Sequence, residues 1–226
     1  MKATSDNTII FFFNDHGQHG KGTFYQGGVY NPSIIWRTEG FPCGEQCDAL
    51  ISSVDFAPTI LELAGSSDPN KGFDGVSFMK ALEGESINSR ESLFFELGYA
   101  RSVIKDKYKY YAVRYPEYAM NWTLDERKDK LERYNRGREL RNMAVVNRDP
   151  QKPFSHLELV PGGGQAEHGS YGKRPGYFDR DQLYDLETDP GEMVNLASDP
   201  GFQIILKEMK DELSTYLEAL PGKFDL

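Results

Sequence analysis

The residues best suited to chemistry stand where a short apolar run ends. Asp15 and His16 follow residues 8–13, a run of Thr, Ile and Phe. A carboxylate oxygen and an imidazole nitrogen can both bind a divalent cation. An Asp-His-Gly sequence at the end of a strand can also form an ordinary turn, in which the Asp side chain hydrogen-bonds to local backbone. From the residue types alone, both interpretations of this pair are open.

Lys21 lies five residues after His16 and has a glycine on each side. Flanking glycines let a ligand approach the backbone closely, and an ammonium group can contact an oxygen of a sulfate or phosphate. Such a contact is worth only about 1 kcal/mol per charge at 4 Å in water and more where water is excluded. The glycine spacing does not fit a phosphate-binding Gly-x-x-x-x-Gly-Lys-Ser/Thr loop. The sequence therefore predicts an anion contact at Lys21 that is not a P-loop.

Five further residues are candidates for substrate binding. His19, in the same loop as Lys21, could donate a hydrogen bond to a substrate, act as an acid or simply be exposed. Glu96 and Arg101 stand on either side of an expected strand turn, where they either line a cleft or form a structural ion pair. His156 and His168 lie in a long loop, a common place for specificity contacts, although solvated loop histidines are the alternative.

Residues 8–13 form a continuous apolar, β-prone run, which predicts a strand buried on both faces, as in a parallel sheet. In open α/β sheets, ligands bind outside the carboxyl ends of the strands. Asp15 and His16 would therefore lie at an edge of the sheet that favours chemistry.

The next part of the chain predicts three elements. Residues 32–37 form a second strand and residues 76–82 a short helix. Residues 53–65 form a helix, with a proline tolerated in its first turn and a glycine at its end. Its inward-facing side chains are expected to be Ile60, Leu61 and Leu63.

The pattern changes near residue 85 towards a smaller layer. Residues 93–96 and 101–114 predict antiparallel strands, and a charge-dense helix is expected over 124–142. Residues 147–176 are rich in Pro and Gly and indicate a loop. A short strand at 182–186 and an amphipathic helix over 202–220 complete the chain.

The composition excludes several classes of function. The chain has 226 residues, 26 basic and 35 acidic, for a net charge of −9, so it has no basic field for nucleic acid. No run approaches the roughly 18 apolar residues of a membrane span, and no signal peptide is expected in this chain. Cys43 and Cys47 are either two loop thiols or a local disulfide, because a zinc site needs a further Cys or His pair.

Several blocks resemble the formylglycine-dependent sulfatases of the alkaline-phosphatase-like superfamily, in the same order along the chain. Residues 6–17 resemble the family's strand and metal motif, and residues 20–29 its sulfate-binding loop. Residues 54–65 and 74–77 resemble a late helix and the turn after it. Residues 183–197 are similar to the family's terminal signature.

The resemblance implies a role for each matching residue. Asp15 and His16 would be calcium ligands, and Lys21 would contact the sulfate group. The implied reaction is hydrolysis of a sulfate ester by a formylglycine hydrate, with metal and Lys stabilising charge on the sulfuryl oxygens. The implied substrate is a sulfated small molecule or glycan, and the implied location is periplasmic, secreted or lysosomal.

The chain also departs from the family pattern. No Cys or Ser stands in the nucleophile pattern Cys/Ser-x-Pro-x-Arg, the early Asp pair of the metal site is missing, and Gln26 replaces the usual Glu. The implied partner is therefore the missing N-terminal half of the enzyme, which would carry the formylglycine and the other metal ligands. The chain by itself is expected to be inactive, because a hard cation usually takes 6 to 8 oxygens.

The expected fold class is α/β. Residues 1–84 would be the end of an alkaline-phosphatase-like sheet domain. Residues 85–226 would be a C-terminal α+β subdomain, consisting of a small antiparallel sheet and a C-terminal helix, with an insertion at about 115–176.

Two other functions stay open. One is a phosphoesterase or phosphonate hydrolase of the same superfamily, and the other is a non-catalytic remnant module. The second is disfavoured, because residues 8–13 would expose apolar edges without parallel neighbours.

Overall fold

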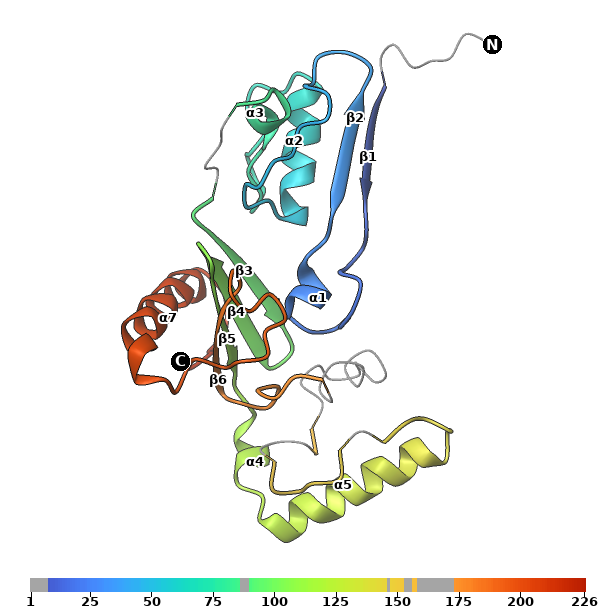
Figure 1. Ribbon diagram of the computed structural model, residues 1–226, viewed down its shortest axis with the longest axis vertical. Coiled ribbons are helices and arrows are strands. Elements are labelled where there is room, and N and C mark those ends of the chain that lie inside the picture. Colours follow the sequence, from blue (N-terminus) through green and yellow to red (C-terminus); the bar gives the residue numbers. More distant parts are fainter. Residues whose placement is uncertain (1–7, 86–89, 146, 153–155, 158–172) are drawn as a thin grey trace. The chain divides into compact units, whose positions relative to one another are not determined.

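The computed structural model (Figure 1) describes residues 8–85, 90–145, 147–152, 156–157 and 173–226. These residues form two compact units. The first contains strand β1 (Ile9–Phe13) and Pro32–Leu93. The second contains Asp15–Asn31 and Phe94–Leu226, so the segment that carries the candidate site residues groups with the C-terminal part of the chain.

In the first unit, β1 pairs antiparallel with β2 (Ser33–Arg37), which confirms the second strand. Helices α2 (Phe56–Leu63) and α3 (Met79–Leu82) follow, the latter shorter than expected. Cys43 and Cys47, in the segment after β2, are both free, exposed thiols.

The expected burial of β1 on both faces is wrong for this structure. Phe11 and Phe13 contact the ring of Phe56 on one face, at centroid distances of 5.9 and 4.7 Å. Ile10 and Phe12 lie on the other face, directly opposite residues of β2, and are exposed. The reason is that β2 is the only strand paired with β1 among the described residues, and no described layer covers this second face.

The buried face of helix α2 also differs from the prediction. Ile60 and Leu61 are exposed, so the predicted inward face is wrong for these two residues, whereas Leu63 is half-buried. Thr59 is fully buried instead. The Thr59 hydroxyl donates to the carbonyl of Asp55 at 2.7 Å and accepts from the Phe78 N–H at 3.1 Å. These hydrogen bonds fix the rotation of the helix, and apolar periodicity alone does not report them.

The buried carboxylate of Asp55 holds this helix start in place. It accepts from the backbone N–H groups of Ser52 and Val76 at 2.7 and 2.8 Å, and it forms an ion pair with Arg90. The polar contacts of Asp55 therefore organise the first unit as much as its apolar side chains do.

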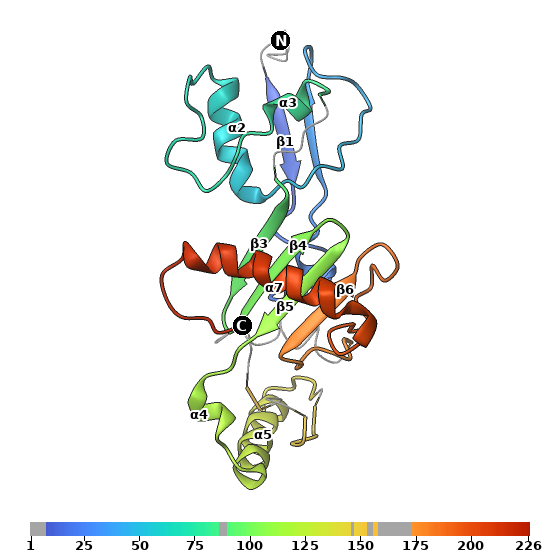
Figure 2. The ribbon, with the colours of Figure 1, turned by 90° about the vertical axis from the view of Figure 1, so that its left-hand side faces the viewer.

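The second unit is built on a four-stranded sheet in the order β3-β4-β5-β6. The strands are β3 (Ser92–Leu97), β4 (Ala100–Lys105), β5 (Tyr108–Val113) and β6 (Asp181–Asp185). The pairings of β5 with β4 and β6 are antiparallel, which confirms the predicted small antiparallel layer. Figure 2 shows helix α7 (Gln203–Glu218) lying across these strands.

The two faces of this sheet carry different side chains, because successive residues of a strand point to opposite sides. One face packs Val103, Tyr110 and Leu183 against α7, whose buried residues include Leu206 and Leu213. The other face carries Tyr111, Val113 and Tyr184, which pack against Phe24 and Tyr25. The predicted amphipathic helix is thus confirmed, and the segment with Phe24 and Tyr25 covers the opposite face.

Helices α4 (Glu117–Met120) and α5 (Leu124–Glu139) lie within the predicted insertion. Thr123 caps α5: its side chain accepts from the Glu126 N–H, while the Glu126 carboxylate accepts from the Thr123 N–H. The helix expected over 124–142 is therefore confirmed. Most of the predicted loop over 147–176 lies outside the described residues.

Among the described residues, none of the helices has the length and apolar character that crossing a membrane requires.

We expect Leu213→Ala to lower the free energy of unfolding by about 2–5 kcal/mol, because it leaves a cavity between α7 and the sheet. Leu213 is fully buried, whereas Ile204 on the same helix is 77% exposed. Ile204→Ala should therefore change the free energy of unfolding by less than about 0.5 kcal/mol. Urea denaturation of both variants measures the difference. Equal losses would contradict the packing of α7 described above.

Candidate functional site

The loop over residues 15–31 is held together by direct backbone contact between its two arms. The Gly17 N–H donates to the carbonyl of Gly28 at 2.8 Å, and the His19 N–H donates to the carbonyl of Gly27 at 2.7 Å. A β-carbon on Gly17 would lie 2.4 Å from the Gly27 oxygen, and one on Gly27 would lie 2.2 Å from the His19 oxygen. The arms can meet this closely only because these positions are glycine.

Lys21 sits at the tip of this loop between two glycines in the left-handed region. Gly20 has φ 98° and Gly22 has φ 81°, which side chains rarely adopt. The Thr23 hydroxyl donates to the Gly20 carbonyl at 2.7 Å and closes the turn. The flanking glycines thus shape the turn that presents Lys21.

Phe24 and Tyr25 anchor the loop in the second unit. Both are buried, and their rings lie 5.3 and 5.4 Å from the ring of Tyr111 on β5. The Tyr25 hydroxyl donates to Gln182 Oε1 on β6 at 2.8 Å. Burial raises the pKa of Tyr25 well above its usual value, so the phenol stays a neutral donor.

A buried ion pair completes this anchor. Lys109 Nζ on β5 lies 2.7 Å from Glu192 Oε1, and both side chains are fully buried. The other carboxylate oxygen of Glu192 accepts from the Gln26 N–H at 2.5 Å, at the start of helix α1 (Gln26–Val29). Burial lowers the pKa of Lys109, while the adjacent Glu192 opposes that effect.

The sequence analysis missed Lys109 and Glu192. The available signal was that Lys109 shares a strand face with Tyr111 and Val113, so a cation occupies an inward position. Glu192 belongs to the block that resembles the family's terminal signature. A buried lysine needs a partner, and an acidic residue in that block was a candidate.

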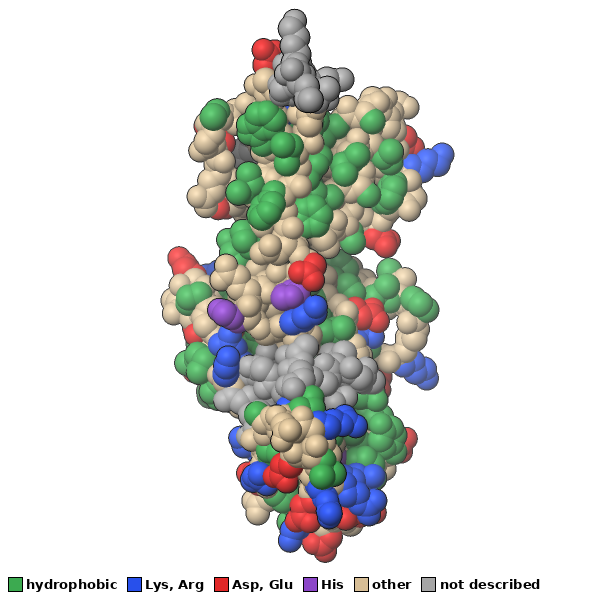
Figure 3. All heavy atoms as spheres, turned by 90° about the vertical axis from the view of Figure 1, so that its right-hand side faces the viewer, with side chains coloured by type: hydrophobic (Ala, Val, Ile, Leu, Met, Phe, Trp, Pro, Cys, Tyr) green, Lys and Arg blue, Asp and Glu red, His purple; other side chains and the backbone are tan. Residues whose placement is uncertain are grey.

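Asp15, His16 and Lys21 come together within this loop. Asp15 Oδ1 lies 3.7 Å from His16 Nε2, and Asp15 Oδ2 lies 3.8 Å from Lys21 Nζ. Histidine, acidic and basic side chains lie close to one another on the face shown in Figure 3. The expected proximity of the three residues is confirmed, whereas their roles remain predictions.

The donors of Asp15 and His16 fit a cation in part. The His16 Nδ1 contacts the carbonyl of Gly17, which can only accept, so the neutral ring keeps its lone pair on Nε2. Asp15 would supply carboxylate oxygens, the ligand type that a hard cation prefers, and its Oδ1 lies 3.7 Å from His16 Nε2. However, no group of three His, Cys, Asp or Glu side chains suited to a metal occurs in the described part of the chain.

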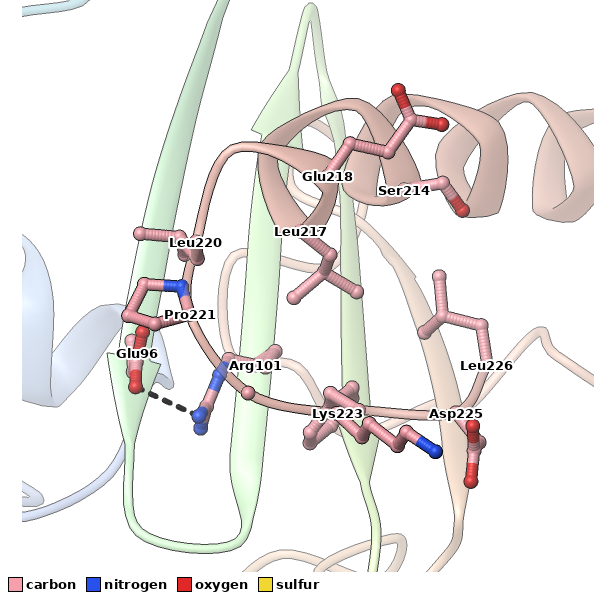
Figure 4. A pocket seen from close by; sticks show the side chains of 12 residues that line it. Glu96, Arg101, Ser214, Leu217, Glu218, Leu220, Pro221, Lys223, Asp225 and Leu226 are labelled. Atoms are coloured by element: carbon pink, nitrogen blue, oxygen red, sulfur yellow. Dashed lines mark hydrogen bonds and ion pairs between the residues drawn. The ribbon is translucent and has the colours of Figure 1, made fainter.

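The other candidates lie apart from this cluster or beside it. His19 is exposed on the same loop. Glu96 and Arg101 form an ion pair at 2.7 Å, and Arg101 lies over the Phe224 ring at 4.9 Å. Both line a cavity of about 410 Å³ formed with the C-terminal residues (Figure 4). Because Phe224 packs on the α7 face of the sheet, this pair lies on the face opposite Phe24 and Tyr25 and is not brought together with Lys21.

His156 is buried against Trp122, with ring centroids 5.0 Å apart, and His168 lies outside the described residues. Burial lowers the pKa of His156 to about 4, and the nearby cations Arg127 and Lys130 act in the same direction. Lys130 Nζ lies 3.8 Å from the centre of the Trp122 ring. The structure thus places His156 in the packing between α5 and the segment after it.

Gly17→Ala should destabilise the chain by about 1–3 kcal/mol, because the new methyl group would overlap the Gly27 carbonyl and push the loop arms apart. Gly137 is the matched control, since a β-carbon there meets nothing within 4 Å. Gly137→Ala in helix α5 should instead stabilise by up to about 1 kcal/mol. Urea denaturation should give opposite signs, and a neutral Gly17→Ala would refute the close contact of the arms.

The His156 pKa of about 4 predicts a pH effect on stability, because the unfolded ring binds a proton near pH 6.5. The contribution of neutral, buried His156 to the free energy of unfolding is complete above pH 6.5, and it is lost as the pH falls towards 4. The slope should be at most about 1.4 kcal/mol per pH unit. Denaturation of wild type and His156→Gln at pH 7 and pH 5 tests this. The variant should lose less stability on acidification, and an equal loss would exclude His156 as the titrating group.

The family model described as N-sulphoglucosamine sulphohydrolase, C-terminal, matches residues 14–157. An ulvan-active sulfatase of Formosa agariphila is 28% identical over 222 residues, which cover 95% of this chain and 34% of that protein. Human arylsulfatase A is 38% identical over 113 residues, which cover 43% of this chain and 22% of that protein. The chain thus spans about a third of the length of the ulvan-active relative.

Solved structures share the fold. A protein in complex with its substrate D-glucosamine-2-N,6-O-disulfate superposes with a TM-score of 0.58 at 20% identity, covering 94% of this chain and 34% of that one. A phosphonate monoester hydrolase of Agrobacterium radiobacter gives a TM-score of 0.57 at 19% identity, covering 95% and 36%. Identities this low support the fold alone, which is mixed α/β with a two-stranded antiparallel sheet, a four-stranded sheet and a C-terminal helix among the described residues.

The family model spans more than half of the chain, and the residues that it matches include the loop carrying Asp15, His16 and Lys21. The chain therefore belongs to the sulfatases, in the family defined by the C-terminal region of N-sulphoglucosamine sulphohydrolase.

Proposed function

We propose that this chain supplies part of the metal and sulfate site of a sulfuric ester hydrolase. The observation that carries the proposal is the convergence of Asp15, His16 and Lys21, because the Asp15 carboxylate lies 3.7 Å from His16 Nε2 and 3.8 Å from Lys21 Nζ. A loop with three tightly packed glycines carries these residues.

Asp15 and His16 would hold a calcium ion through a carboxylate oxygen and Nε2. The metal, when bound, supplies positive charge that offsets the negative charge of the sulfuryl oxygens. Lys21 would contact one of these oxygens through its ammonium group. The ion needs more ligands than these two, and the chain has no residue in the nucleophile pattern. The remaining ligands and the formylglycine would come from the rest of the enzyme.

The exposed face of the β1–β2 pair supports a partner of this kind. Ile10 lies opposite Trp36 and Phe12 opposite Ile34, so all four side chains share one face. Their exposed fractions run from 46% to 65%. A contiguous apolar face of this type marks a surface that another layer covers. We assign that layer to the N-terminal half of the catalytic domain.

We propose a sulfated glycan as the substrate class. The supporting observations are the ulvan-active relative and the related structure solved with a disulfated glucosamine. A periplasmic, secreted or lysosomal location belongs to the same proposal and rests on the family resemblance. The exposed His19 lies on the Lys21 loop and is the nearest further candidate for a sugar contact.

A chimera tests the proposal, with this chain placed after the preceding part of the Formosa agariphila sulfatase. We expect it to hydrolyse an aryl sulfate faster than an aryl phosphate. Lys21→Ala should lower the sulfatase rate by about 10²–10³-fold, the usual cost of removing one charge-stabilising donor. Rates are measured by release of the chromogenic phenol at saturating calcium.

Lys71→Ala is the control, because Lys71 is also an exposed lysine next to a glycine but lies in the first unit. It should leave the rate unchanged. A clear preference for aryl phosphate would favour the phosphonate hydrolase alternative. Equal rates for the two lysine variants would remove Lys21 from the sulfate site.

A further inference from the structure

We infer that Glu192 is a positioning residue for the loop that carries Lys21. Its carboxylate joins Lys109 on the sheet to the backbone of Gln26 at the root of the loop. The importance of the loop for sulfate binding rests on the proposed function, whereas the clamp itself rests on the contacts that follow.

Both oxygens of the Glu192 carboxylate are used, and by different partners. Oε1 lies 2.7 Å from Lys109 Nζ, and Oε2 lies 2.5 Å from the Gln26 nitrogen. Glu192 and Lys109 are fully buried, so water does not compete for these bonds. Hydrogen bonds to a charged acceptor are about twice as strong as neutral ones, and more so at low local dielectric.

The backbone at Glu192 indicates that this side chain is needed there. Its φ is 55°, in the left-handed region that favours glycine. The Asp189 carboxylate accepts from the N–H groups of Met193 and Val194 at 2.7 and 2.8 Å and fixes the turn around it. A glycine would satisfy this backbone more easily, so the contacts of the Glu192 carboxylate outweigh the cost of the conformation.

Hydrogen bonds between the two arms of the loop connect this clamp to the arm that carries Lys21. Gln26 is followed by Gly27 and Gly28, whose carbonyls accept from the N–H groups of His19 and Gly17. Fixing Gln26 therefore fixes the arm of the loop against which the other arm is aligned. That other arm begins beside Asp15 and His16 and ends at the Lys21 turn.

Gln26→Pro removes the N–H at the loop end of the clamp and leaves Glu192 Oε2 without this donor. Gln26 is the first residue of α1, the position where proline is tolerated because its N–H has no partner within the helix. The preceding residue, Tyr25, has φ −61° and ψ 153°, which is the conformation that proline favours before it. The Lys109–Glu192 ion pair stays intact, so the fold of the sheet should be preserved.

Two double variants isolate the acceptor without leaving a buried charge. Lys109→Met with Glu192→Gln keeps a side-chain oxygen for the Gln26 N–H, whereas Lys109→Met with Glu192→Leu removes it. Replacing both members of a buried pair by neutral groups is tolerated far better than removing one. The first double variant should therefore retain the loop, and the second should release it.

Amide hydrogen exchange of the full 226-residue chain, followed by NMR, is the measurement. Without sulfate, exchange at Gly17 and His19 should rise at least about tenfold in Gln26→Pro and in the Leu double variant. Exchange in α7 and on β5 should change by less than about twofold. Glu212→Gln is the control, because Glu212 pairs with Lys105 at 2.6 Å on the α7 side and should leave the loop amides unchanged.

Unchanged loop exchange in Gln26→Pro would overturn the inference. An equal rise throughout the sheet and α7 would also overturn it, since Glu192 would then be a general structural residue. A loosened loop in the Gln double variant would show that the retained acceptor does not position it.

Titration of the chimera described above with sodium sulfate, at saturating calcium, tests the proposed function separately. The chimera with the unchanged chain should bind sulfate, and the chimera with Gln26→Pro should bind it about tenfold more weakly, as expected for a displaced cation. A chimera that binds no sulfate would contradict the proposed function and leave the clamp supported by exchange in the 226-residue chain.

Discussion

The buried ion pair of Lys109 and Glu192 is the contact on which the candidate site depends. Removing two charges from water is costly, and their attraction offsets this cost only when further hydrogen bonds satisfy the remaining atoms. Here the second oxygen of Glu192 accepts from the Gln26 N–H. A strand, a turn near the C-terminus and the glycine loop are thereby joined at one carboxylate. The pair therefore specifies where the loop lies, in addition to any contribution it makes to stability.

The two faces of the sheet in the second unit pack against different parts of the chain. Beneath α7, apolar side chains of the sheet pack against buried helix residues such as Leu213. The opposite face combines aromatic rings with polar groups, and Gln182 Oε1 accepts from both Tyr25 and Tyr184 at 2.8 and 2.9 Å. Directional hydrogen bonds fix position more tightly than apolar contact does. The loop with Lys21 is built on this second face.

The first unit and the proposed metal site both leave contacts to be supplied from elsewhere. One face of β1 and β2 presents four exposed apolar side chains. In the proposed site, Asp15 and His16 would supply only two of the ligands that a hard cation needs. The chain also spans 34% of the length of its ulvan-active relative. All three observations are consistent with a catalytic centre that is shared with the remainder of a sulfatase.

The sequence alone determined the antiparallel strands of the second unit, helices α5 and α7, the family, and the proximity of Asp15, His16 and Lys21, because local periodicity and motif order carry this information. Only the tertiary structure decided which faces are covered. It exposed Ile60 and Leu61 on α2, left one face of β1 open and placed Arg101 on the sheet face away from the loop. It also joined Lys109 to Glu192, 83 positions later, and Gln26 to Glu192 across 166 positions. Periodicity shows that a face is apolar or polar, whereas its neighbour is set by contacts between residues far apart in the chain.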